Sequence, residues 1–191
     1  MAGKSLEGIP ALYESHFLRD VTYTASGLIV VATVFISFAG RLSPLVAAME
    51  RHLILAIMVL VLSYVVGLLL QEGFTALGLF RTEPDIPQPF KTRHVLMSEI
   101  AQRCGPAATR ELERTIYLKH VGAAIGSASV IASICLLVAS CAHDVRYLFG
   151  LLFSLPLLLV CLYLNKSKLK EQNEALKDFA SRLRNPKPNA G

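Results

Sequence analysis

The sequence predicts an all-α integral membrane protein, with four transmembrane helices and a small helical cytoplasmic layer. Apolar residues make up 53% of the 191 residues and charged residues only 17%. Soluble domains are about 45–50% apolar and about 25% charged. The apolar residues gather in four blocks without Asp, Glu, Lys or Arg. Each block has about the length, roughly 20 residues, that a helix needs to cross about 30 Å of hydrocarbon. The blocks are Val21 to Ala39, Leu53 to Leu70, Val121 to Ala142 and Tyr147 to Leu164.

The positions of Lys and Arg predict which helix ends face the cytoplasm. Of the 19 Lys and Arg residues, only Arg41, Arg51 and Arg146 lie in the loops between spans one and two and between spans three and four. Cations accumulate in the short cytoplasmic loops of membrane proteins. We therefore expect both termini and the long loop after the second span to lie in the cytoplasm.

A cleaved signal peptide is the rival interpretation of the first block, because Ser37-Phe38-Ala39 is a small-x-small pattern. Such a peptide starts with a positively charged region, but here Glu7, Glu14 and Asp20 precede the block. We expect the first span to be retained.

The segments around the spans suggest five parts. The proline-rich run from Arg81 to Pro89 favours an extended connector, and two helical stretches follow it, Thr92 to Cys104 and Pro106 to His120. Leucines at seven-residue spacing indicate an amphipathic helix in the tail. The parts are an interfacial N-terminal helix (1–20), transmembrane helices one and two (21–80), a basic cytoplasmic loop with two helices (81–120), transmembrane helices three and four (121–164), and a cytoplasmic C-terminal helix and tail (165–191).

Signatures of catalysis and of cofactor binding are missing from the sequence. It contains no GxSxG, HExxH, Walker loop or GxGxxG between a strand and a helix. The five histidines are scattered, and the four cysteines lack metal-ligand spacing. We expect no enzymatic activity, no cofactor and no metal site.

The third span carries a face of small residues. Gly122, Gly126, Ser129 and Ser133 recur at helical spacing, and small residues let two helices approach closely while hydroxyls bond across the contact. The pattern predicts helix packing and leaves open whether this packing lies within one subunit or between subunits.

The first span carries a row of hydroxyls, Thr22, Ser26, Thr33 and Ser37, on one face. An uncharged hydroxyl row suits the lining of a water-filled pore. It also suits helix packing, because Ser and Thr can bond the carbonyl four residues earlier on their own helix.

The basic residues inside the cell have three interpretations: positive-inside topology with anionic lipid contact, an anionic ligand such as a nucleotide or oligonucleotide, and a cytoplasmic protein partner. Arg103, Arg110 and Arg114 are the candidates for a phosphate-binding surface. Glu111 and Glu113 dilute that patch.

The layout, in which Phe17-Leu18-Arg19-Asp20 leads directly into the first span and a compact basic layer lies inside, resembles that of small multi-span membrane effectors of bacterial anti-phage systems, such as Hailong-type channel effectors. The resemblance covers most of the chain and rests on no diagnostic motif. It implies a homo-oligomeric pore that depolarises the cell inner membrane and is gated by a nucleotide or oligonucleotide. No gating residue transfers by position.

Two functions of different classes follow as hypotheses. The first is a homo-oligomeric channel or membrane-disrupting effector gated through its basic cytoplasmic layer, with the pore between subunits because four helices fill their own centre. The second is a non-conducting membrane scaffold or accessory subunit that binds a cytoplasmic partner. A transporter comes third, because the spans offer neither charges nor repeats from which to build a substrate site.

Overall fold

The computed structural model describes residues 8–81, 83–85, 87, 95, 99–100, 102 and 106–184, and their regular structure is helical, without a strand. The predicted helix from Thr92 to Cys104 lies largely outside these residues. The elements, in chain order, are α1 (Gly8–Ala39), α2 (Ser43–Arg51), α3 (Leu53–Ala76), α5 (Pro106–Ala142), the 3-10 helix η1 (Val145–Gly150) and α6 (Leu151–Arg184).

Four helical segments are long and apolar enough to cross a membrane. They are Phe17–Ala39, Leu53–Ala76, Thr109–Ala142 and Val145–Arg182. Each contains most or all of one of the four apolar blocks. The prediction of an all-helical fold with four candidate spans is therefore confirmed for the described part of the chain.

Three helices join segments that the sequence suggested as separate. The expected interfacial helix runs into the first span as α1, the second loop helix runs into the third span as α5, and the fourth span runs into the tail helix as α6. Pro156 lies inside α6 without ending it. At about 1.5 Å per residue, the 37 residues of α5 and the 34 of α6 extend over about 55 and 51 Å. Both are longer than the roughly 30 Å of a hydrocarbon core.

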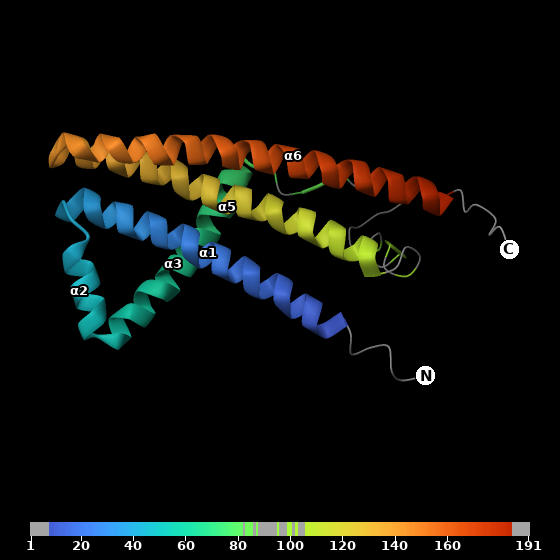
Figure 1. Ribbon diagram of the computed structural model, residues 1–191, viewed down its shortest axis with the longest axis horizontal. Coiled ribbons are helices and arrows are strands. Elements are labelled where there is room, and N and C mark those ends of the chain that lie inside the picture. Colours follow the sequence, from blue (N-terminus) through green and yellow to red (C-terminus); the bar gives the residue numbers. More distant parts are fainter. Residues whose placement is uncertain are drawn as a thin grey trace.

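The long helices α5 and α6 lie side by side and antiparallel, with α1 along α5 (Figure 1). The starts of α1 and α5 and the end of α6 lie at the same end of the molecule. At this end, residues 106–120 of α5 and 165–184 of α6 form a helix pair that we call the extension. Its buried residues Leu112, Ile116 and Leu176 form a cluster with Ile100 of the preceding loop, and Ala175 and Phe179 pack against this cluster.

The opposite end is closed by short helices. The loop from Gly40 to His52 contains α2. Gly40 ends α1 with a left-handed φ of 68°, and its carbonyl accepts a hydrogen bond from the Tyr147 hydroxyl of η1. The Asp144 carboxylate accepts the Arg146 N–H at 2.8 Å and caps η1.

Two glycines allow α1 and α3 to cross with their backbones in contact, at the oblique crossing visible in Figure 1. A Cβ atom added to Gly27 would lie 1.7 Å from the Ser63 carbonyl oxygen, and one added to Gly67 would lie 2.0 Å from the Tyr23 carbonyl oxygen. Any side chain at either position requires the helices to move apart. Beyond the crossing α3 diverges from α1, and its outer half is exposed on several sides, with Leu53 75% and Ile54 76% exposed.

The chain leaves α3 through a turn that returns it to the bundle. Gly78 adopts a left-handed φ of 74° after the end of α3, and Phe80 follows at 1% exposure. The Phe80 ring occupies the space over Gly126, where a Cβ would lie 2.4 Å from the ring. The exit of α3 is thus anchored against α5.

Candidate functional site

The four hydroxyls of the first span, the candidate pore lining, make hydrogen bonds inside the bundle. Thr22 and Ser26 are buried, and Thr33 and Ser37 are half-buried. Each donates to a carbonyl three or four residues earlier in α1, and two also contact α5. The contacts are Thr22 to Leu18 at 2.8 Å, Ser26 to Tyr23 at 2.9 Å, Thr33 to Ile29 at 2.9 Å, Ser37 to Thr33 at 2.9 Å, Thr22 to the Tyr117 hydroxyl at 3.3 Å and Ser37 to the Cys135 carbonyl at 2.8 Å.

The small residues of the third span contact other parts of the same chain. A Cβ on Gly122 would lie 3.0 Å from the Cys161 carbonyl oxygen of α6, and Gly126 lies under the Phe80 ring. Ser129 bonds its own helix at 2.9 Å, while Ser133 donates to the Ser154 hydroxyl of α6 at 2.9 Å. This face is covered within the subunit.

Of the three arginines suggested as an anionic-ligand surface, Arg110 and Arg114 lie on α5 in the extension, and both are exposed. Arg103 lies outside the described residues. The structure therefore places two of these arginines near each other and leaves the trio incomplete.

A buried amide joins three helices where the spans meet the extension. Gln71 of α3 is 1% exposed, and its Nε2 lies 3.3 Å from the Tyr23 hydroxyl of α1 and 3.2 Å from His120 Nδ1 of α5. The Tyr23 ring packs edge-on against Tyr64 of α3, with ring centroids 6.1 Å apart. The Gln71 Oε1 has no hydrogen-bond partner in the described part of the chain, so the amide uses only its donor side to join these helices.

A buried cation joins α5 to α6 in the extension. Lys119 has no exposed surface, and its Nζ donates to the Gln172 Oε1 at 2.7 Å. Gln172 is itself 1% exposed. A buried charge costs several kcal/mol unless it is well compensated, so this contact supports a particular register of the two helices.

Two asparagines of α6 hold the connector that follows α3. The Asn165 side chain accepts the Arg81 N–H and donates to the Arg81 carbonyl, both at 3.2 Å, and it also donates to the Lys119 carbonyl at 3.1 Å. Two turns further, Asn173 accepts the Asp85 N–H at 3.1 Å and donates to the Asp85 carboxylate at 3.2 Å. Arg81 and Asp85 of the connector therefore lie against α6.

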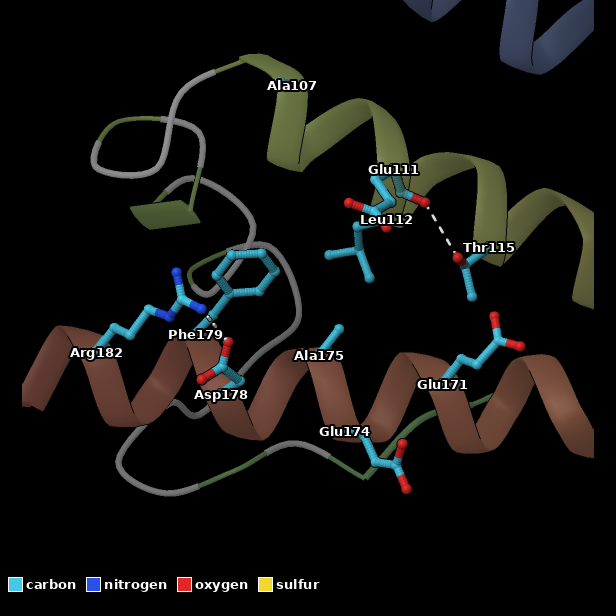
Figure 2. A pocket seen from close by; sticks show the side chains of 10 residues that line it. All are labelled: Ala107, Glu111, Leu112, Thr115, Glu171, Glu174, Ala175, Asp178, Phe179 and Arg182. Atoms are coloured by element: carbon cyan, nitrogen blue, oxygen red, sulfur yellow. Dashed lines mark hydrogen bonds and ion pairs between the residues drawn. The ribbon is translucent and has the colours of Figure 1, made fainter.

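A groove of about 590 Å³ lies between the two helices of the extension (Figure 2). We call it the α5–α6 groove. The half-buried Ala175 and Phe179 supply its apolar surface, and the buried Leu112 lies behind them. Four carboxylates and one guanidinium supply its charges. The charged residues are Glu111 of α5 and Glu171, Glu174, Asp178 and Arg182 of α6, and Ala107 and Thr115 complete the lining.

The charge of this groove determines which ligands it can hold. Its lining is acidic, and Arg110 and Arg114 are not part of it. Arg182 is the one basic residue of this lining and is paired with Asp178, so the lining offers phosphate little attraction, whereas its exposed carboxylates attract cations. Among the described residues no group of three His, Cys, Asp or Glu side chains is arranged to hold a metal ion. The groove suits an extended cationic and partly apolar ligand.

Comparisons with known proteins add no identification. No protein-family model, curated protein or solved structure matches the chain.

Sequence reasoning missed the groove and the close helix crossing. The acidic stripe of α6 was visible as Glu171, Glu174 and Asp178 at helical spacing, but its partner wall on α5 lies about 60 residues earlier. Gly27 and Gly67 are isolated glycines in apolar runs. Neither glycine forms a GxxxG pattern that could have identified it.

Proposed function

We propose that this chain is a non-conducting membrane scaffold that holds a cytoplasmic partner on its extension. The observation that carries the proposal is the direction of the polar groups in the four apolar blocks. Every serine and threonine in these blocks is buried or half-buried and hydrogen-bonded, most of them to a carbonyl of their own helix.

The outward surface of the blocks is almost entirely apolar. Large exposed side chains include Leu53 at 75%, Ile54 at 76% and Phe153 at 78%. Such a surface matches lipid chains, and it offers an ion no polar wall between neighbouring subunits. Insertion of the four helices into a bilayer, with the extension projecting into the cytoplasm, is part of the proposal.

The competing proposal is the homo-oligomeric channel or membrane-disrupting effector. It requires the hydroxyl row of α1 to turn from the packed interior toward a water-filled path. Homo-oligomerisation, anionic lipid contact, a nucleotide ligand, an antiviral role and an inner-membrane location stay predictions from the sequence.

Ion flux through proteoliposomes separates the two proposals. We expect vesicles containing the purified chain to leak no faster than empty vesicles, with and without nucleotides. We also expect Thr33→Asp, which puts a charge into a packed site near the bilayer centre, to prevent folding. Flux from the wild type, or a folded Thr33→Asp variant with altered ion preference, would favour the channel.

Reporter fusions test the orientation that the scaffold needs. Fusions after Gly191 and between Pro84 and Pro89 are expected to report the cytoplasm, and a fusion at Asp144 the opposite side. An external signal from the 84–89 position would contradict the proposed topology.

A further inference from the structure

The two walls of the α5–α6 groove form regular stripes. Glu171, Glu174, Asp178 and Arg182 lie at i, i+3, i+7 and i+11 on α6, so they share one face. Ala107, Glu111 and Thr115 lie at i, i+4 and i+8 on α5. At about 1.5 Å per residue the α6 wall is about 16 Å long, which is about three turns of a helix lying in the groove.

The apolar surface lies between these charged walls. Leu112 is 2% exposed and belongs to the buried cluster of the extension, while Ala175 and Phe179 pack against it and are half-buried. In Figure 2 the side chains of Leu112 and Ala175 point toward one another from the two helices, with Glu111 and Glu171 on opposite walls. An apolar strip flanked by carboxylates matches a helix with one apolar face and basic edges.

The carboxylates of the groove are accessible to a partner. Asp178 pairs with Arg182 at 2.8 Å, Glu171 with Lys168 at 2.6 Å and Glu174 with Lys170 at 3.8 Å, all within α6. The carboxylate side chains are 48% to 66% exposed, and ion pairs at such sites contribute about 0–1 kcal/mol. Cations of a partner can therefore compete for them.

Glu111 provides a carboxylate that is not engaged in this way. Its side chain makes no ion pair in the described part of the chain, and its backbone carbonyl accepts the Thr115 hydroxyl at 3.1 Å. Glu111 and Glu171 together place one carboxylate from each helix on the groove.

We propose that the α5–α6 groove binds a basic amphipathic helix of a partner protein, with the apolar face of that helix on Ala175 and Phe179 and its Lys or Arg side chains on the carboxylates. This inference rests on the proposed scaffold function and specifies the chemistry of the partner. Helix-in-groove recognition of this kind uses apolar anchors at i, i+3, i+4 and i+7.

A synthetic probe peptide tests the inference on the full chain in nanodiscs of zwitterionic lipid. The probe is a Leu/Lys helix of about 18 residues, because shorter helices are marginal in water, and it carries a single Trp. The chain contains no Trp, so the blue shift of the probe, measured against empty nanodiscs, reports binding without background from the chain. A Leu/Glu peptide with the same Leu and Trp positions is the comparison.

We expect the Leu/Lys probe to bind, the Leu/Glu peptide not to bind, and affinity for the Leu/Lys probe to fall as salt rises. The double variant Glu111→Gln/Glu171→Gln should bind the probe about tenfold more weakly. The matched control Glu50→Gln/Glu72→Gln removes two exposed carboxylates that lie outside the groove, and it should bind like the wild type.

Three results would overturn the inference. They are equal binding of the two peptides, equal binding by the groove variant and the wild type, and self-association of the chain that the groove variant abolishes, which would assign the groove to a second copy. Flux measured on the same preparation tests the scaffold separately. Peptide binding together with ion flux would reject the non-conducting scaffold and leave the groove assignment intact.

Discussion

Replacing Gly67 by alanine tests the close crossing of α1 and α3 with a single methyl group. The new Cβ would lie 2.0 Å from the Tyr23 carbonyl oxygen and 2.7 Å from the Ser26 hydroxyl oxygen. Real Cβ contacts essentially never fall below 3.0 Å, and the closest atom is backbone, so the helices must separate by about 1 Å. Overpacking of this kind costs about 1–3 kcal/mol.

The same α3 helix supplies a matched control. Gly73 has no atom within 4 Å of an added Cβ, so Gly73→Ala changes helix propensity without a clash. Alanine is favoured over glycine inside a helix by about 0.5–1 kcal/mol. We expect Gly73→Ala to be neutral or slightly stabilising.

The difference between the two variants is measured as thermal stability in mild detergent. Each variant is fused to a fluorescent protein and heated, and size-exclusion chromatography then records how much of the monodisperse peak is lost. Gly67→Ala should lower the midpoint by roughly 2–12 °C. Gly27→Ala should behave similarly, and the double variant should lose less than the sum, because one separation of the helices relieves both clashes. If the Gly67→Ala and Gly73→Ala variants have the same melting midpoint, α1 and α3 do not cross at Gly27 and Gly67.

Further predictions concern the contacts of α5 and α6. Asn165→Leu removes three hydrogen bonds to backbone atoms and should lower the free energy of unfolding by about 1–3 kcal/mol. Trypsin should then cleave the connector after α3 faster, and an unchanged cleavage rate would contradict the anchoring role of Asn165. Gln172→Leu deprives the buried Lys119 ammonium of an acceptor at 2.7 Å and should lower the melting midpoint, whereas Gln172→Glu should preserve it; equal midpoints would reject this contact. Gly126→Leu should destabilise the isolated subunit, because its Cβ meets an aromatic ring at 2.4 Å, while Val130→Leu should not; a Gly126→Leu subunit as stable as wild type but with a changed oligomer mass would assign this face to subunit contacts.

The positions of the spans could be predicted because they depend on local composition. A block of about 20 uncharged apolar residues has few alternatives to a buried or membrane-spanning helix, and each of the four blocks lies in a helical segment long and apolar enough to cross a membrane. The internal boundaries were less predictable. No strong helix breaker separates the expected interfacial helix from the first span or the second loop helix from the third span, so α1 and α5 continue through both segments.

The sites depended on partners that are distant in the sequence. The hydroxyl row of α1 and the small residues of α5 were recognisable from their spacing, but spacing does not say which helix covers them. Ser37 meets Cys135 from α5, and Ser133 meets Ser154 from α6. Those contacts depend on which helices lie next to one another in the folded chain.

The sequence by itself therefore determined the helical class, the four candidate spans and the faces that carry small or polar residues, because each depends on neighbours within a few turns. Only the tertiary structure decided that Gly27 meets Ser63 and that Lys119 meets Gln172. It also brought Glu111 and Glu171 onto one groove. The members of these pairs lie roughly 35 to 60 residues apart in the sequence, and they meet only because α3 crosses α1 and α6 returns antiparallel along α5.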